Sequence, residues 1–318
     1  MKVLHLRIDS LPGYRSDAIE KGFRELGFDY IGFNWQPYRF EYGTEKLRQQ
    51  VVDLSSQTSP DIIFAHIQNP EIFELDTWEQ LSKHGFVINY TFDVRQPEKQ
   101  LWLHEVAKIV GHTFFACDRD VLNCHQQGIK NVSAIHSSCD MDLFRPSVKR
   151  NLYALDIAFV GNRYDNTNLD FPMDGYRQEM IEIISGSGWN FMPYGLGQRG
   201  GLIRPEQESN VYNFSKICIN QNNFYLHGYT SDRLWRIMAA GAFCLTQHFP
   251  GIEKIFERGV HLDWFENFDE MIDLIKKYLS NEQERNEIAR IGSNYVRENH
   301  TWKNRIEEML KVIEPVHA

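Results

Sequence analysis

Short apolar runs alternate with amphipathic segments along the whole chain. The runs at 62–65, 155–160 and 242–246 have the length and composition of strands buried on both faces of a parallel sheet. Segments with helical spacing, such as 16–26 and 97–110, lie between the runs. This alternation with short connections predicts α/β architecture, with parallel sheets covered by helices on both faces.

The expected elements fall into two series. Strands are expected at 2–8, 30–33, 61–66, 86–90, 113–116 and 131–136, and then at 155–160, 189–194, 217–220 and 242–246. Helices are expected at 16–26, 44–54, 76–84, 97–110, 175–184, 206–213, 231–240 and 268–279, followed by an amphipathic run at 282–312. The second series starts after the turn at Arg145 and Pro146 and a polar stretch. A length of 318 residues suits two domains, which we place at 1–147 and 148–298, with a C-terminal helix at 299–318.

The composition narrows the classes of function. A content of 42% hydrophobic and 24% charged residues is typical of a globular protein. The net charge of −9 disfavours a broad nucleic-acid footprint, because such binding depends on Lys and Arg. The five cysteines have no disulfide or zinc spacing, so we expect them to be reduced. The N-terminus has no signal-peptide core and no apolar stretch approaches ~20 residues, so a cytoplasmic location is expected.

The segment from Ser231 to Gly241 predicts an anion site at the start of a helix. Ser231 or Asp232 can cap the helix, and the other N–H groups of the first turn stay free beside the positive end of the helix dipole. Arg233 and Arg236 are three residues apart, so both could close on a diphosphate. An ordinary core helix with two solvated arginines fits these residues equally well.

Loops after strands in the second half supply further candidates, since ligands of parallel sheets bind at the carboxyl ends of strands. Gly195–Gly201 contains a formal GxGxxG, but Leu202–Pro205 follows instead of a helix, which argues against a dinucleotide site. A loop that donates backbone N–H groups to a ligand fits better. Arg163 follows Gly161 and Asn162 at the end of another strand, where the glycine would let a ligand approach.

The first half carries polar groups directly after apolar strands. His66 and Asp93 are candidates for a general base that takes a proton from an attacking hydroxyl, and Arg95 could bind an acceptor or pair with Asp93. For each of these three residues taken alone, a supporting hydrogen bond is a more common role than catalysis. Asp140 and Asp142 form a DxD with no second carboxylate or histidine cluster nearby in the sequence to complete a ligand shell, so we predict no protein-bound metal.

Together these features resemble the two-domain glycosyltransferases of the GT-B fold, and most closely the CgeB-like branch. The resemblance covers nearly the whole chain and is carried by DIAFVGN, YNFSKICIN, SDRLWRIMAAGAFCLT and YVRENHTWKNRIEEML, with INYTFDVR in the first half and CDMDLFRP at the interdomain junction. It implies two Rossmann-like α/β/α domains facing an interdomain cleft, with a C-terminal helix crossing back to the first domain.

The resemblance also implies the chemistry. The second domain would bind a nucleoside-diphosphate sugar and the first a hydroxyl acceptor (a glycan, small molecule, protein or modified nucleobase), with no metal and no cofactor beyond the co-substrate. The donor site would comprise Gly161, Asn162, Arg163, Tyr194, Gly195, Gly197, Arg204, Tyr229, Thr230, Ser231, Asp232, Arg233 and Arg236. The acceptor site would comprise Asp9, Gly13, Tyr14, Gln68 and Arg95, with Asp93 and His66 in catalysis.

One departure from the family pattern leaves alternatives open. Many relatives have Phe-Glu at the position of Trp235 and Arg236, and that Glu accepts hydrogen bonds from the nucleotide ribose. A noncatalytic GT-B relative that binds nucleotide or sugar is therefore a second interpretation. An epimerase or another nucleotide-sugar enzyme on the same scaffold is a third.

Overall fold

The computed structural model describes residues 1–9, 17–147, 154–164 and 172–317, and these form two compact units. Unit 1 consists of Met1–Ser137 and Trp302–Ala318, and unit 2 of Ser138–Thr301. The sequence places these boundaries after 147 and after 298. Residues 138–147 group with unit 2 because the Ser209 hydroxyl donates to the carbonyl of Leu143 at 2.9 Å.

Unit 1 is built on one parallel sheet of six strands in the order β2-β1-β3-β4-β5-β6. Its strands are β1 Lys2–Arg7, β2 Asp29–Asn34, β3 Ile62–Ala65, β4 Phe86–Thr91, β5 His112–Phe115 and β6 Val132–Ala134. Its helices are α1 Asp17–Glu25, α2 Trp35–Tyr42, α3 Thr44–Thr58, α4 Leu75–Leu81, α5 Pro97–Ile109, α6 Asp118–Gln126 and α12 Trp302–His317. Side chains alternate between the faces of each strand, so apolar cores form on both faces of the sheet. One core lies under α1 and α12, another lies under α3 and α4, and a smaller one lies between α5, α6 and the strands β5 and β6.

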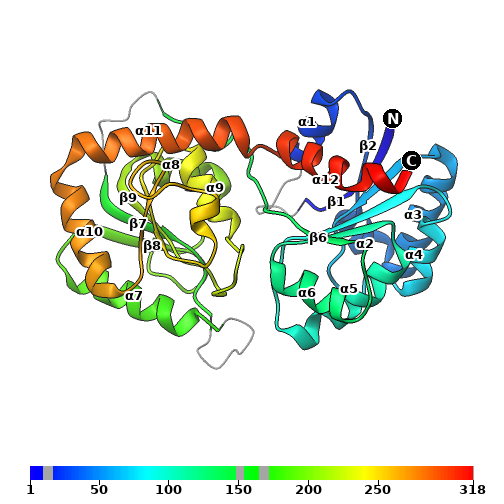
Figure 1. Cartoon of the computed structure of the whole chain (residues 1–318), viewed down its shortest axis with the longest axis horizontal. Helices are drawn as coiled ribbons and strands as arrows, with labels where there is room; N and C mark the ends of the chain where they lie inside the picture. The colour runs from blue at the N-terminus through cyan, green and yellow to red at the C-terminus, as the bar shows by residue number, and fades with distance from the viewer. Residues whose placement is uncertain (10–16, 148–153, 165–171, 318) are drawn as a thin grey trace. The chain divides into compact units, whose positions relative to one another are not determined.

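The C-terminal helix α12 belongs to unit 1. It lies beside α1, as the red and blue ribbons of Figure 1 show, and contributes four buried apolar side chains to the core on that face: Trp302, Ile306, Met309 and Ile313. Gly22 allows this approach, because a Cβ there would stand 2.9 Å from Cδ1 of Ile306. The helix that crosses back to the first domain is thus present, and it begins at Trp302.

Unit 2 repeats the plan with a parallel sheet of five strands in the order β11-β10-β9-β7-β8. Its strands are β7 Leu155–Val160, β8 Phe191–Tyr194, β9 Ser215–Asn220, β10 Cys244–Gln247 and β11 Asp263–Phe265. Its helices are α7 Asp174–Gly186, α8 Pro205–Asn213, α9 Asp232–Ala239, η1 Ile252–Lys254, α10 Phe268–Ser280 and α11 Glu282–Asn299. One core lies under α8, α9 and α11, and the other under α7 and α10.

The structure corrects several of the expected elements. The helices α2 and α6 lie in stretches where the sequence predicts none, and the run at 282–312 is divided into α11 and α12 at His300 and Thr301. A dinucleotide site would need a helix that begins at the third glycine of the loop. The next helix, α8, begins only at Pro205, in agreement with the argument against such a site. Across the described ranges, every helix is too short or too polar to cross a membrane.

Candidate functional site

An arginine from α9 occupies the carboxyl edge of the sheet in unit 2. The Arg233 guanidinium donates to the carbonyl of Gln221 at 2.7 Å and to Oδ1 of Asn220 at 3.3 Å. Its central carbon lies 5.0 Å from the centroid of the Phe159 ring, within the range of a cation–π contact. Arg233 is therefore held where the carboxyl ends of β7 and β9 meet.

A second arginine, Arg177 of α7, approaches the same place from inside the unit. It is buried and donates to Oε1 of Gln221 at 2.8 Å and to the carbonyl of Asn162 at 2.9 Å. Its guanidinium lies 5.5 Å from the Phe159 ring. Burial, and then the charge of Arg233, lower the pKa of Arg177 to about 9, so it still carries a positive charge at neutral pH.

Within the described parts of the chain, these two positive charges have no carboxylate at ion-pair distance, although the charge of the buried Asp174 acts on Arg177 from farther away. Arg177 and Arg233 donate to amide and carbonyl oxygens, and among the described residues no carboxylate forms an ion pair with either. Buried charges are normally paired. Two unpaired guanidinium groups beside a helix start are therefore suited to bind an anion such as a diphosphate.

The turn before α9 is fixed by the amide of Asn222. Its Oδ1 accepts from the N–H of Ser231 at 3.0 Å, and its Nδ2 donates to the carbonyl of Tyr229 at 3.2 Å, while Thr230 is buried between them. Ser231 is the N-cap residue, as predicted, but its hydroxyl donates to Asn220 instead of capping the helix. The N–H of Leu234 donates to the carbonyl of Ser231 at 3.2 Å, whereas the N–H groups of Asp232 and Arg233 receive no cap from the Ser231 side chain and are the candidates for an anion.

Two glycines of the predicted donor site allow chain segments to meet. A Cβ on Gly161 would lie 2.9 Å from Nη2 of Arg233, so the glycine makes room for this arginine, whereas the sequence suggests that it makes room for the ligand. Gly195 has φ +134°, and a Cβ there would lie 2.4 Å from the carbonyl oxygen of Gly161. The Asn162 amide oxygen accepts from the N–H of Leu196 at 3.0 Å. The loops after β7 and β8 therefore form one rim around Arg233.

The remaining predicted donor residues lie on or after this rim. Arg163 is exposed, and Gly197 packs against it, since a Cβ on Gly197 would lie 3.2 Å from Cβ of Arg163. Tyr194 is half-buried, and Arg204 is exposed as the N-cap residue of α8. Their roles in binding the base and phosphates remain predictions.

Gly161→Ala should lower nucleotide affinity about tenfold. The added methyl group has to displace either the Arg233 guanidinium or the Phe159 ring, which would lie 2.8 Å away. Calorimetric titration with UDP measures the effect, and Gly186→Ala in α7, where a Cβ has no neighbour within 4 Å, is the control. Unchanged affinity in Gly161→Ala would show that Arg233 does not bind the nucleotide from this position.

Arg236 occupies a different environment from the one predicted. It forms ion pairs with Glu208 at 3.1 Å and with Asp232, and its guanidinium lies 5.5 Å from the Phe144 ring. Its charge is therefore neutralised within the protein. The prediction that Arg233 and Arg236 close together on a diphosphate is corrected, because only Arg233 has its charge available.

His66 in unit 1 is a core residue. It is 1% exposed, neither ring nitrogen has a hydrogen-bond partner, and the rings of His5, Phe64, Tyr90 and Phe92 lie within 5.7 Å of it between centroids. Burial lowers the pKa of His66 to about 3, so the imidazole is neutral at pH 7. A buried ring cannot take a proton from an acceptor without movement, and this argues against the predicted catalytic role.

Asp93 and Arg95 contact each other on the surface of unit 1. Their charged groups are 3.8 Å apart, which is the simple pairing considered from the sequence. The side-chain oxygen of Gln68 accepts from the N–H of Asp93 at 3.1 Å and from the Thr91 hydroxyl at 3.3 Å, so Gln68 orders this loop. Asp93 is exposed and still accessible to an acceptor.

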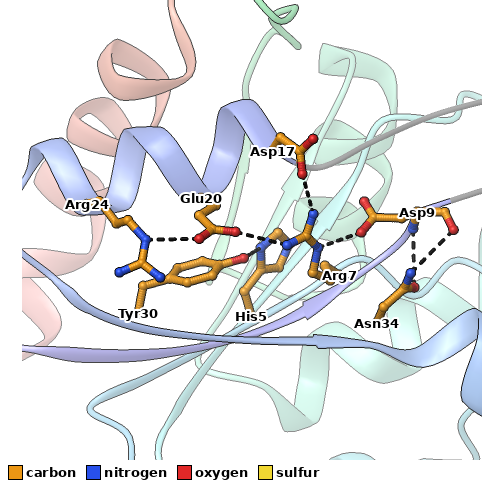
Figure 2. Close-up of polar contacts among 8 residues, drawn as sticks. All are labelled: His5, Arg7, Asp9, Asp17, Glu20, Arg24, Tyr30 and Asn34. Carbon is orange, nitrogen blue, oxygen red and sulfur yellow. Dashed lines mark hydrogen bonds and ion pairs between the residues drawn. The ribbon is translucent and has the colours of Figure 1, made fainter.

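Asp9 is tied to Arg7, which Figure 2 shows at the centre of a cluster of carboxylates. Arg7 forms ion pairs with Asp9 at 2.6 Å, Asp17 at 2.7 Å and Glu20 at 2.9 Å. Asp9 is therefore engaged within the protein, not free for an acceptor. The predicted acceptor residues Gly13 and Tyr14 lie outside the described residues.

Four contributors to the anion site were not predicted: Phe159, Arg177, Gln221 and Asn222. The signal for Gln221 and Asn222 was present, because both directly follow the apolar strand β9 at a carboxyl end. Arg177 lies within a helix, where an arginine normally faces solvent. Its place at the anion site therefore cannot be predicted from the sequence and becomes visible only in the structure.

The acidic pair of the DxD has a structural role. Oδ1 of Asp140 accepts from the N–H groups of Asp142 at 2.9 Å and Leu143 at 3.1 Å, which is an Asx-type turn. Nowhere in the described ranges do three or more His, Cys, Asp or Glu side chains come together in a metal-binding arrangement. The predicted absence of a metal stays a prediction.

Comparison with solved structures shows the GT-B fold. HepE of Anabaena, solved with UDP and glucose, is 13% identical, with a TM-score of 0.66 over 98% of this chain and 99% of its own. Sucrose-phosphate synthase of Thermosynechococcus elongatus is 10% identical, with a TM-score of 0.67 over 99% of each chain. The DNA-modifying β-glucosyltransferase, studied with and without UDP-glucose, is 13% identical, with a TM-score of 0.65 over 99% of this chain and 100% of its own.

A match to a protein family adds to this likeness in fold. Residues 142–311 match the glycosyl transferase-like family, and the chain belongs to that family. No curated protein matches the sequence.

Proposed function

We propose that this protein is a glycosyltransferase that moves a sugar from a nucleoside-diphosphate sugar to a hydroxyl acceptor. The observation that carries the proposal is the pair of guanidinium groups of Arg177 and Arg233 at the carboxyl edge of unit 2, which form no ion pair with a carboxylate of the described residues. During transfer, negative charge builds on the departing diphosphate. Fixed positive groups that meet this charge stabilise the transition state.

The finer features of the proposal come from the similar structures and from the sequence motifs. UDP-glucose is the first donor to test, because HepE and the DNA-modifying β-glucosyltransferase are described with it. A hexosyl or pentosyl donor, metal independence and membership of the CgeB-like branch follow from the resemblance in sequence motifs. The five cysteines are unpaired and buried, which supports a reducing location such as the cytoplasm.

Calorimetric titration with UDP, GDP, ADP, CMP and dTDP in the presence of EDTA tests the proposal. We expect one nucleotide to bind with a micromolar Kd, and the matching nucleotide-sugar to be hydrolysed slowly to free sugar. Binding that appears only when Mg²⁺ or Mn²⁺ replaces EDTA would contradict metal independence. No binding of any nucleotide under either condition would contradict the proposed function itself.

A noncatalytic nucleotide-binding protein is the second candidate. The structure motivates it because Arg236, at the position of the expected ribose-binding Glu, is fully engaged with Glu208 and Asp232. Nucleotide binding without donor hydrolysis, and without transfer to glycans, small molecules, proteins or modified nucleobases, would favour this candidate.

A further inference from the structure

A tyrosine, a histidine and a carboxylate lie in line at the carboxyl edge of unit 2. Nε2 of His248 is 2.7 Å from Oε1 of Glu253, and Nδ1 of His248 is 3.1 Å from the Tyr225 hydroxyl. The three residues come from different segments: Tyr225 from the loop after β9, His248 from the residue after β10, and Glu253 from η1. The order hydroxyl, imidazole, carboxylate is the arrangement that activates a hydroxyl in many enzymes.

The carboxylate decides the direction of the hydrogen bonds. A carboxylate oxygen only accepts, so Nε2 of His248 carries the proton that it donates to Glu253. In the neutral imidazole Nδ1 is then the acceptor, and the Tyr225 hydroxyl donates to it. The pKa of Glu253 is lowered by its own backbone N–H and by the hydrogen bond with His248, so the carboxylate is ionised at neutral pH.

The exposure of the three groups fits a relay that opens toward solvent. The His248 side chain is 18% exposed, the Glu253 side chain is 55% exposed and the Tyr225 residue is 49% exposed. The backbone N–H of His248 donates to the carbonyl of Phe265 at 2.8 Å, which fixes this residue at the end of the sheet. Both ends of the relay are thus open to solvent, and the tyrosine is the end that presents a hydroxyl.

The relay and the anion site share one loop. Gln221, whose carbonyl accepts from Arg233, precedes Tyr225 by four residues, so their Cα atoms are at most about 14 Å apart. The N–H of Gly228 donates to the carbonyl of Pro250 at 2.9 Å, which joins this loop to the segment that carries His248 and Glu253. Both groups therefore lie on the same edge of one rigid unit.

We propose that Tyr225, His248 and Glu253 form a proton relay in which the Tyr225 hydroxyl takes the proton of the attacking acceptor. This inference rests on the proposed glycosyltransferase function. The acceptor oxygen bonds to the anomeric carbon of the donor sugar as the bond from that carbon to the diphosphate breaks, and the electron pair leaves with the diphosphate beside Arg233. The acceptor proton passes to the Tyr225 oxygen while the proton of Tyr225 passes to Nδ1 of His248, and Glu253 stabilises the resulting imidazolium.

The relay also predicts the stereochemistry. A general base that activates the nucleophile acts on the face of the sugar opposite the leaving group, so the configuration at the anomeric carbon is inverted. Of the bases considered in unit 1, His66 is buried, whereas Asp93 is exposed and pairs with Arg95 at 3.8 Å.

Steady-state kinetics on Tyr225→Phe, His248→Gln and Glu253→Gln in the full chain test the relay. For Tyr225→Phe we expect kcat to fall about 100-fold or more, with the donor KM and the Kd for UDP unchanged within about twofold. Glu253 acts through His248 as a positioning residue, and its variant should lose about tenfold in kcat with the same unchanged Kd. Tyr42→Phe, which removes a hydroxyl from a tyrosine that is 46% exposed in unit 1, is the matched control.

The anomeric configuration of the product, followed by NMR, gives a second readout. Inversion together with the selective loss in kcat supports the relay. Retention of configuration, full kcat in Tyr225→Phe, or a rise in donor KM alone would overturn it, the last by showing that Tyr225 binds the sugar. If the variants bind UDP and still transfer sugar at the full rate, the relay is wrong but the proposed function stands. If the wild-type protein binds no nucleotide, the proposed function is wrong as well.

Discussion

Arg233→Met is expected to weaken binding of UDP by about 30-fold or more while the fold stays intact. Removing one member of a hydrogen-bonded pair between charged groups costs about 2 to 5 kcal/mol of binding free energy. The stability should be kept, because Arg233 forms no ion pair with any residue that the structure describes and its removal relieves repulsion with Arg177. Calorimetric titration gives the Kd, and urea unfolding gives the free energy of unfolding.

Arg236→Met should show the opposite behaviour. It leaves the Glu208 carboxylate, whose side chain is 8% exposed, without its cation, so we expect a loss of about 3 kcal/mol in stability. The Kd for UDP should change little under conditions where the variant is folded. Lys276→Met, which removes an exposed positive charge from α10, controls for the change in net charge.

Comparing Arg233→Met with Arg236→Met shows which arginine binds the nucleotide. If Arg236→Met loses affinity and Arg233→Met does not, the diphosphate binds on the side of α9 that faces Glu208. The original expectation from the sequence, in which both arginines bind, requires that both variants lose affinity.

The sequence predicts the sheets well because each buried strand is a short apolar run between polar loops. It fails at α2, where aromatic residues and Pro37 obscure the helical period, although proline is tolerated in the first turn of a helix. It also fails at α6, which has a short polar sequence that buries only Asp120 and Cys124. Both helices depend on tertiary contacts more than on local preference.

The anion site was predictable in its position and less so in its members. The rule that ligands bind at the carboxyl ends of parallel strands identified the loop with Gly161 and the start of α9. This rule cannot tell which arginine has its charge neutralised, because Glu208, which pairs with Arg236, lies 28 residues earlier in the sequence. The burial of His66 is equally invisible in the sequence, since it requires aromatic side chains from three other strands or loops.

The buried histidines of unit 1 should make the protein sensitive to acid. Burial lowers the pKa of His66 to about 3 and of His112 to about 4, and burial, His66 and Arg7 lower that of His5. The unfolded chain binds these protons near pH 6.5 and the folded chain does not, so the stabilisation is complete above pH 6.5 and is lost as the pH falls toward the folded pKa values. His66 and His112, whose folded pKa values both lie below 5, should together remove about 4 kcal/mol of the free energy of unfolding between pH 7 and pH 5, and His5 acts in the same direction.

His66→Phe should reduce this pH dependence by about a third to a half and leave catalysis intact. The phenyl ring can occupy the aromatic pocket, and it has no nitrogen atoms that need partners, whereas both ring nitrogens of His66 lack them. Urea unfolding at pH 7, 6 and 5 measures the free energy of unfolding, with the exposed His125→Gln as the control. A stability that stays constant from pH 7 to pH 5 would contradict the burial argument, and loss of transfer in a stably folded His66→Phe would return His66 to the catalytic role that the sequence suggests.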